Sequence, residues 1–203
     1  MSKISVLMSV YKKENPEYLR ASLESILVQT RTADEILLIE DGPLTQELYQ
    51  VVAEYQKKCD YLHVHAMEQN VQLGRALAKG VELCQYDLIA RMDTDDIAMP
   101  DRLEKEEAYM EAHPEVDVVG GAIREFNDEG TIDRVKNMPK TQEEFLEYVK
   151  VRNPLNHMTV MYRKDSILKA GNYKHFPFLE DYSLWSRMLS QGFQFRIMED
   201  ILV

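Results

Sequence analysis

The chain has 203 residues, of which 45% are hydrophobic and 29% charged, and its formal net charge is −11. This length favours one domain, or two tightly fused halves, around a core of useful size. The acidic balance argues against a nucleic-acid partner, because most of the surface would repel a polyanion, but a bound divalent cation would still allow a single nucleotide to bind.

The first half of the chain alternates short apolar runs with helical patterns. Runs rich in β-forming residues predict strands at residues 4–10, 35–39, 62–66 and 86–92. Apolar residues at helical spacing predict helices at residues 17–28, 46–57 and 73–83. Near-continuous apolar strands suit a parallel sheet buried on both faces. The order therefore predicts a doubly wound α/β sheet with right-handed crossovers.

The second half of the chain is less regular. Its patterns predict a charged, exposed helix at 101–111 and further helices at 142–151 and 181–190. Strands are expected at 116–126, 157–162 and 193–198. We expect this half to extend the sheet and to close one side of a cleft.

An acidic cluster follows the fourth predicted strand. Asp93, Asp95 and Asp96 lie within the segment from Met92 to Asp96. Three carboxylates at one strand end need compensation, and Mg²⁺ or Mn²⁺ with oxygen ligands would supply it at the edge of an α/β sheet where ligands collect. The alternative is an acidic surface turn that begins the helix after Pro100.

Two other strand ends carry polar or aromatic residues. Asp41-Gly42 follows the second predicted strand, and Ser9 and Tyr11 close the first. If the first strand is central in the sheet, these ends converge with the acidic cluster at one crevice. Each is also explained as an ordinary strand end or turn. Arg75, on the third predicted helix, would either pair with a phosphate or lie solvated on the surface.

The segment before residue 190 combines an acidic pair with the chain's single tryptophan. Trp185 lies four residues after Asp181 and therefore on the same face of the predicted helix. A carboxylate beside an aromatic ring suits a sugar site, with Glu180 as the neighbouring acid. In the alternative, Asp181 caps the helix and Trp185 fills the core. His157 would line the acceptor side of the cleft or make a structural hydrogen bond.

Several short segments carry a family resemblance when they are taken in order. They are residues 5–11, residues 25–30, Asp41-Gly42, Asn70 with Gly74 and Gly80, residues 93–96 with 99–103, and Glu180-Asp181 with Leu184-Trp185. Nearly the whole chain resembles the family-2 glycosyltransferases, especially bacterial members that build capsule, O-antigen or exopolysaccharide. These motifs specify the family much better than they specify the sugar.

The resemblance implies a GT-A fold, a Rossmann-like mixed sheet flanked by helices, with residues 1–100 as the nucleotide-sugar donor half and 101–203 as the acceptor half. It implies that Ser9, Tyr11 and Asp41 hold the base and ribose, with Arg75 as a further donor contact. Asp93 would contact the ribose or donor sugar, and Asp95 would bind Mn²⁺ or Mg²⁺. Asp181 would be the general base of an inverting hexosyl transfer.

The implied partners are a nucleotide sugar, most plausibly a UDP-sugar, and a saccharide or lipid-linked saccharide acceptor. A sugar-phosphate nucleotidyltransferase and a non-catalytic carbohydrate-binding protein are the alternatives. The first would want a glycine-rich basic loop, which residues 6–13 do not offer. GxGxxG and GxxxxGK[ST] are also absent, which disfavours dinucleotide-dependent dehydrogenases and P-loop NTPases.

The sequence also bears on location. No apolar run approaches the roughly 18 residues of a membrane span, and the N-terminus lacks a signal-peptide pattern, so we expect a cytoplasmic protein. A lipid-linked acceptor would bring it to the inner membrane face as a peripheral protein. Cys59 and Cys84 are expected to be free, buried thiols. The chain is either truncated after Val203 or a short member, and its oligomeric state is not specified.

Overall fold

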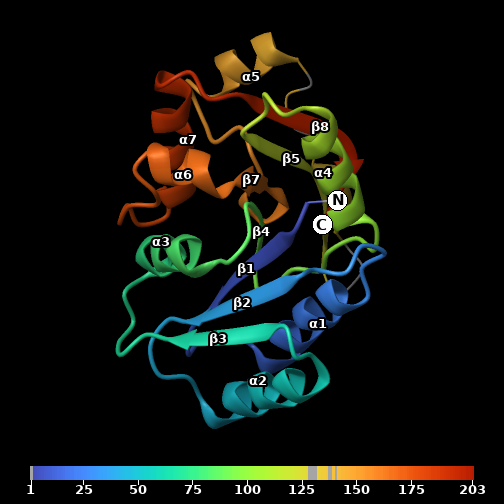
Figure 1. Ribbon diagram of the computed structural model, residues 1–203, viewed down its shortest axis with the longest axis vertical. Coiled ribbons are helices and arrows are strands. Elements are labelled where there is room, and N and C mark those ends of the chain that lie inside the picture. Colours follow the sequence, from blue (N-terminus) through green and yellow to red (C-terminus); the bar gives the residue numbers. More distant parts are fainter. Residues whose placement is uncertain (1, 128–131, 137–138, 140) are drawn as a thin grey trace.

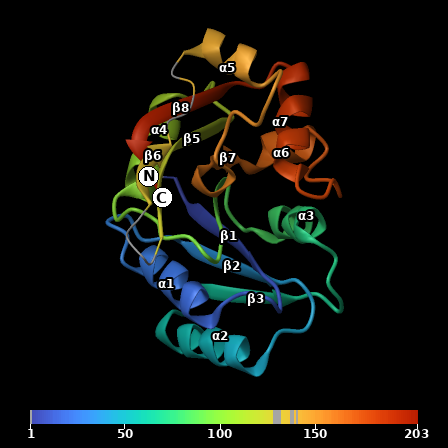
Figure 2. The ribbon, with the colours of Figure 1, turned by 180° about the vertical axis from the view of Figure 1, so that it is seen from behind.

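The computed structural model describes residues 2–127, 132–136, 139 and 141–203 (Figure 1). An eight-stranded mixed sheet runs in the order β3-β2-β1-β4-β7-β5-β6, and β8 pairs with β5 beside this path. Helices cover both faces. In both views of Figures 1 and 2, α3, α6 and α7 lie on one side of the sheet, opposite α1.

The first half folds as a parallel sheet with helical crossovers. Its strands are β1 (Ile4–Val10), β2 (Glu35–Glu40), β3 (Leu62–Ala66) and β4 (Leu88–Met92), and its helices are α1 (Pro16–Leu27), α2 (Gln46–Lys58) and α3 (Leu73–Leu83). β1 lies between β2 and β4 and is parallel to both. Side-chain caps set the starts of α1 and α2, since Asn15 accepts from Glu17 N–H and Thr45 from Leu48 N–H. The first strand is therefore central in the parallel part of the sheet, which is the condition under which the strand ends were expected to converge.

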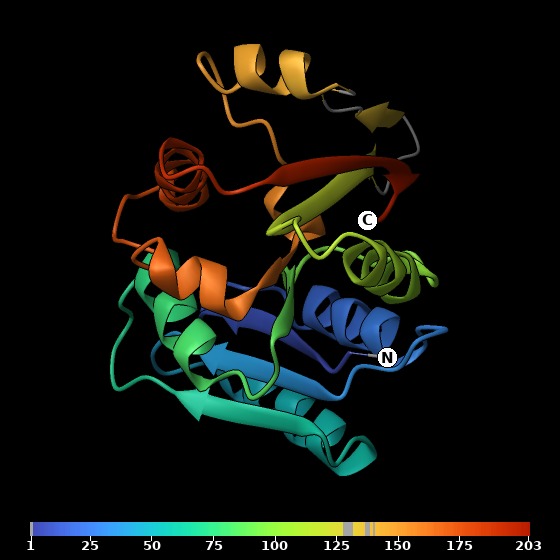
Figure 3. The ribbon, with the colours of Figure 1, turned by 45° about the horizontal axis from the view of Figure 1, so that its top comes forward.

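The second half adds mostly short, partly antiparallel strands. Its strands are β5 (Val118–Phe126), β6 (Asp133–Lys136), β7 (Met161–Arg163) and β8 (Phe195–Ile201), and its helices are α4 (Arg102–Ala112), α5 (Gln142–Tyr148), α6 (Lys164–Lys169), α7 (Glu180–Ser190) and the 3₁₀ turn η1 (His157–Thr159). β7 is antiparallel to both β4 and β5. β5 therefore points in the same direction as β4, and Figure 3 shows β8 running along β5 between α7 and α4.

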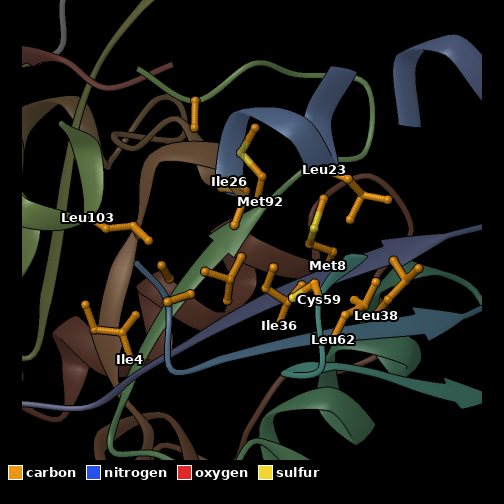
Figure 4. Close-up of a cluster of buried hydrophobic side chains, with 14 of the residues drawn as sticks. Ile4, Met8, Leu23, Ile26, Ile36, Leu38, Cys59, Leu62, Met92 and Leu103 are labelled. Carbon is orange, nitrogen blue, oxygen red and sulfur yellow. The ribbon is translucent and has the colours of Figure 1, made fainter. Parts of the chain in front are cut away.

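Each face of the sheet has its own hydrophobic core. One core joins alternate residues of β1, β2 and β4 to α1, α2 and α4, and part of it is drawn in Figure 4, with Met8, Ile36 and Met92 meeting Leu23 and Ile26. The other core joins the opposite strand faces to α3, α6 and α7. Because β1, β2 and β4 are buried on both faces, their sequences are nearly continuous runs of apolar residues. Cys59 and Cys84 are free and buried, as expected.

The structure corrects two sequence expectations in the second half. The strand predicted at 157–162 is instead the 3₁₀ turn η1 followed by the three-residue strand β7. The helix predicted to be charged and exposed at 101–111 forms, but it buries Arg102, Glu106 and Glu107. The buried face of α4 therefore combines charged side chains with the apolar residues Leu103 and Met110, which join the core.

Arg102 and Glu106 form a wholly buried ion pair beneath the end of β4. The Arg102 Nε lies 3.0 Å from Glu106 Oε2, and Arg102 also donates to the carbonyl of Arg91 at 2.7 Å. Burial raises the pKa of Glu106 to about 7, although Arg102 opposes the shift. The pair therefore ties α4 to the strand that leads into the acidic cluster.

Replacing Arg102 with Met should destabilise the fold at pH 8 by about 3–5 kcal/mol, because Glu106 must then either keep an uncompensated charge in the core or take up a proton against the solution pH. Urea denaturation measures this loss. The loss should shrink at pH 5.5, where the unpaired Glu106 holds a proton. The double variant Arg102→Met with Glu106→Leu should recover most of the stability at pH 8. A single variant as stable as wild type at pH 8 would contradict the assignment.

Candidate functional site

A cavity of about 430 Å³ opens at the carboxyl edge of the parallel strands. The carboxyl ends of β1, β2 and β4 meet there because the three strands are parallel neighbours. The structure brings six of the sequence-predicted residues to its wall. They are Ser9, Tyr11, Asp41, Asp93, Asp95 and Glu180. Strand ends that are far apart in the sequence therefore form one site, as predicted.

Asp41 is held rigidly at the end of β2. Its side chain is 5% exposed, and its carboxylate accepts from Val71 N–H at 2.6 Å and from Asn70 Nδ2 at 2.9 Å. Burial raises its pKa, although the hydrogen bonds partly oppose this. Gly42 adopts φ +84°, and a Cβ there would lie 2.5 Å from Asn70 N. The turn thus needs glycine, both for its conformation and for the close approach of the Asn70 backbone.

Asp93 is fixed by a residue that sequence reasoning missed. The guanidinium of Arg91 is 1% exposed and contacts both carboxylate oxygens of Asp93. The two side chains lie two residues apart, on the same side of the chain leaving β4. The sequence feature that could have identified Arg91 is an arginine within an apolar strand, followed two residues later by an aspartate. A buried cation directly beneath the acidic cluster offsets part of its charge.

Asp93, Asp95 and Asp96 come close enough to share one cation. One carboxylate oxygen from each lies within 4.8 Å of the others. Burial and the neighbouring carboxylates raise the pKa of Asp95, and they raise the pKa of Asp96 to about 7. Carboxylates that resist ionisation beside each other favour a bound divalent cation, and their oxygens are the ligands that Mg²⁺ and Mn²⁺ prefer. The donor set therefore fits the predicted metal.

The wall contains other residues that the sequence did not single out. Glu14 accepts from Thr94 Oγ1 at 2.7 Å and so ties the loop after β1 to the acidic cluster. Gln72 begins α3 with φ +71°, an uncommon conformation for a residue with a side chain. Gly74 lets α3 approach the segment before α7, since a Cβ there would lie 2.5 Å from Lys174 O. Contacts between loop residues produce no periodic pattern in the sequence, so these residues could not be identified from the sequence alone.

Asp181 follows Glu180 in the first turn of α7. It is buried, and unlike Glu180 it is not among the residues that line the cavity. Its side chain is 8% exposed, and its Oδ1 accepts from Tyr182 N–H at 2.6 Å while Oδ2 accepts from Asn153 Nδ2. Leu179 is the N-cap residue, so the alternative role of Asp181 as helix cap is wrong. Burial raises the pKa of Asp181, and both hydrogen bonds lower it. A raised pKa makes the carboxylate a better proton acceptor.

Three other sequence candidates are not at the cavity wall. Trp185 is 0% exposed, which corrects the expected stacking on a sugar: its ring fills the core against Phe195 and Tyr173. His157 makes the structural hydrogen bond, with Nε2 2.9 Å from Tyr173 Oη. Burial and the Arg91 guanidinium hold its pKa well below the usual range. Arg75 is exposed on the outer side of α3.

A mixed sheet with a carboxylate cluster at the end of its fourth strand, and a further carboxylate, Glu180, on the wall of the same cavity, places the chain in the class of GT-A glycosyltransferases. Residues 5–171 match the profile described as Glycosyl transferase family 2, and the chain belongs to this family. The expected fold class and family are therefore confirmed.

Two relatives with assigned names are similar along almost the whole chain. The amylovoran biosynthesis glycosyltransferase AmsE of Erwinia amylovora is 43% identical over 199 residues, covering 98% of this chain and 74% of the relative. An Escherichia coli protein named UDP-Gal:alpha-D-GlcNAc-diphosphoundecaprenol beta-1,3-galactosyltransferase is 34% identical over 207 residues, covering 99% of this chain and 73% of the relative.

A solved structure shows the same fold. The mannosyltransferase PcManGT from Pyrobaculum calidifontis, in complex with GDP-Man and Mn²⁺, matches with a TM-score of 0.75 at 13% identity. The match covers 98% of this chain and 55% of that one. Within the residues described here, no helix is long and apolar enough to cross a membrane.

Proposed function

We propose that this protein is an inverting, metal-dependent glycosyltransferase that moves a hexose from a UDP-sugar to a saccharide or lipid-linked saccharide. The product would serve surface polysaccharide synthesis. The observation that carries the proposal is the Asp93–Asp95–Asp96 cluster on the wall of a cavity in a family-2 chain. The names of the two relatives support the pathway, the UDP-sugar and the lipid-linked acceptor.

The donor would lie along the ends of β1, β2 and β4. Ser9, Tyr11 and Asp41 would hold the base and ribose, and Asp93 would contact the ribose or donor sugar. Asp95 would be the principal ligand of Mn²⁺ or Mg²⁺, and the bound ion would offset the charge on the departing nucleoside diphosphate. The Mn²⁺ in the PcManGT complex supports this choice of ion.

The acceptor would enter from the side of α7. Asp181 would remove the proton from the attacking hydroxyl as it displaces the nucleoside diphosphate in line, so the anomeric configuration inverts. Glu180 would line the sugar-binding side. In this assignment, residues 1–100 would supply most of the donor contacts, and residues 101–203 would form the acceptor side. A cytoplasmic location with peripheral membrane contact stays a prediction.

The purified protein should release UDP from at least one UDP-sugar when Mn²⁺ and an acceptor are present. A suitable acceptor probe is GlcNAc α-linked to a diphosphate with a short synthetic alkyl chain, and UDP-Gal, UDP-Glc and UDP-GlcNAc are the donors. Chelation with EDTA should lower the rate by about 100-fold or more, since a metal contributes several kcal/mol. Equal rates with and without EDTA would contradict metal dependence, and no transfer from any UDP- or GDP-sugar would contradict the activity.

A further inference from the structure

Aromatic residues line part of the cavity, and the buried Trp185 is not one of them. The segment from His175 to Phe178 lines it, directly before the acidic pair at the start of α7. Phe178 is 95% exposed and Phe176 is 53% exposed. Phenylalanine rings with this much exposure are unusual, because exposed aromatic side chains gain little from folding.

The backbone at Phe178 is strained. Leu179 N–H donates to Phe176 O at 2.9 Å, which closes a four-residue turn with Pro177 in its second position and Phe178 in its third. Phe178 has φ +66°. Turns of this kind take proline in the second position and glycine or asparagine in the third. A bulky aromatic residue with positive φ is an outlier, and it needs a reason.

Folding alone does not provide that reason. A side chain that is 95% exposed contributes almost no buried surface, so nothing in the free protein offsets the strained backbone. Glycine would make the same turn without strain. Local rules that are broken without a gain in packing tend to mark functional positions. A ring this exposed is free to contact a ligand in the cavity that the segment lines.

We propose that Phe178 is the platform on which a pyranose ring of the acceptor stacks, an inference that rests on the proposed function. The proposed function places the diphosphate end of the donor at Asp95, and Asp95 and Phe178 line the same cavity from different elements, the loop after β4 and the segment before α7. Phe178 precedes Asp181, the assigned base, by three residues, and its exposed ring is accessible to an incoming acceptor. A flat apolar ring suits the C–H face of a sugar.

The key comparison is between Phe178→Gly and Phe178→Ala. Both variants lose the ring, so the acceptor KM should rise about tenfold, as for truncation of an aromatic anchor in a binding site. The donor KM and the slow hydrolysis of the UDP-sugar in the absence of acceptor should not change. Glycine also relieves the strain, so the melting temperature of Phe178→Gly should stay at or above that of wild type and exceed that of Phe178→Ala.

Phe126→Ala is the matched control. Phe126 is another exposed phenylalanine, but it lines a second cavity of about 590 Å³, bordered by residues of α1 and β5, which shares Asp95 with the first and does not include residues 175–178. Its loss should leave the acceptor KM unchanged. A higher acceptor KM in Phe126→Ala, with wild-type kinetics in both Phe178 variants, would overturn the proposal. A rise in the donor KM alone would move the platform to the donor sugar and overturn it as well.

A binding experiment tests the platform without relying on turnover. Phe178→Trp introduces an exposed tryptophan into a chain whose own Trp185 is buried, so a new red-shifted emission reports on position 178. The GlcNAc-diphosphate probe, added after UDP and Mn²⁺, should shift this emission to the blue. No shift would overturn the proposal even if the enzyme is active, whereas a shift without transfer would fault the assigned reaction and keep the platform. A shift only with anionic vesicles would overturn it in favour of membrane contact.

Discussion

Replacing Asp95 with Asn should abolish the metal dependence of UDP binding and lower transfer by roughly 10³-fold. The amide keeps the size of the side chain but loses the charge that holds a divalent cation beside Asp93 and Asp96. A metal that neutralises a leaving diphosphate contributes several kcal/mol to the transition state, and each 1.4 kcal/mol is a factor of ten. Calorimetric titration with UDP, with Mn²⁺ and after chelation, measures the first effect, and an initial-rate assay measures the second.

The control for Asp95→Asn is Asp60→Asn, which removes an exposed carboxylate outside the cavity and should leave both measurements unchanged. The pH dependence gives a further check. The pKa of Asp96 is raised to about 7, so protons compete with the cation as the pH falls from 8 to 6, and wild-type affinity for UDP with Mn²⁺ should fall with it. Equal wild-type affinity for UDP with Mn²⁺ and after chelation would refute the metal assignment.

The first half of the fold was predictable because each of its strands and helices follows a short, repeating pattern of apolar residues. β1, β2 and β4 are buried on both faces, so they appear as mainly apolar runs, and α1, α2 and α3 each show one apolar face. The second half lacks these signals. The four residues of β6 are all exposed and show no alternation, and α6 has only six residues. β7 has three residues, and its place in the sheet depends on partners distant in the sequence.

The residues of the functional site likewise fall into a predictable group and a less predictable group. Ser9, Asp41, Asp93 and Asp95 follow parallel strands, so topology alone predicts that they meet. The partners that orient the carboxylates were harder to predict: Arg91, which holds Asp93, gives only the weak signal of an arginine in an apolar strand, and Asn153, which holds Asp181, lies in an irregular loop. Trp185 shows a further limit: helical spacing places it near Asp181, but it does not say which side chain faces the cavity and which fills the core.

Replacing Asp181 with Asn should lower transfer by about 100-fold or more while UDP and Mn²⁺ bind almost as tightly as before, because the amide cannot accept the acceptor's proton. Some stability should also be lost. Leu155 N–H donates to Asn153 Oδ1 at 3.2 Å, which points the Asn153 amide hydrogens at Asp181, and Tyr182 N–H points at the other oxygen. An amide offers one oxygen to two donors, so about 1–3 kcal/mol should go. Transfer rate, UDP affinity and chemical denaturation, measured well below the melting temperature, separate the two effects.

Glu180→Gln is the variant that makes this test decisive. Glu180 lines the cavity and Asp181 lies behind it, so geometry in the unliganded protein leaves either carboxylate as a candidate base. Hydrogen bonds at catalytic groups often tighten only when substrate is bound, so partial burial does not exclude Asp181. We expect Glu180→Gln to raise the acceptor KM with a smaller loss of kcat, whereas Asp181→Asn should lower kcat. If Asp181→Asn retains near-wild-type kcat and only its stability falls, then Asp181 is a structural residue. A large loss of kcat in Glu180→Gln would in that case make Glu180 the base.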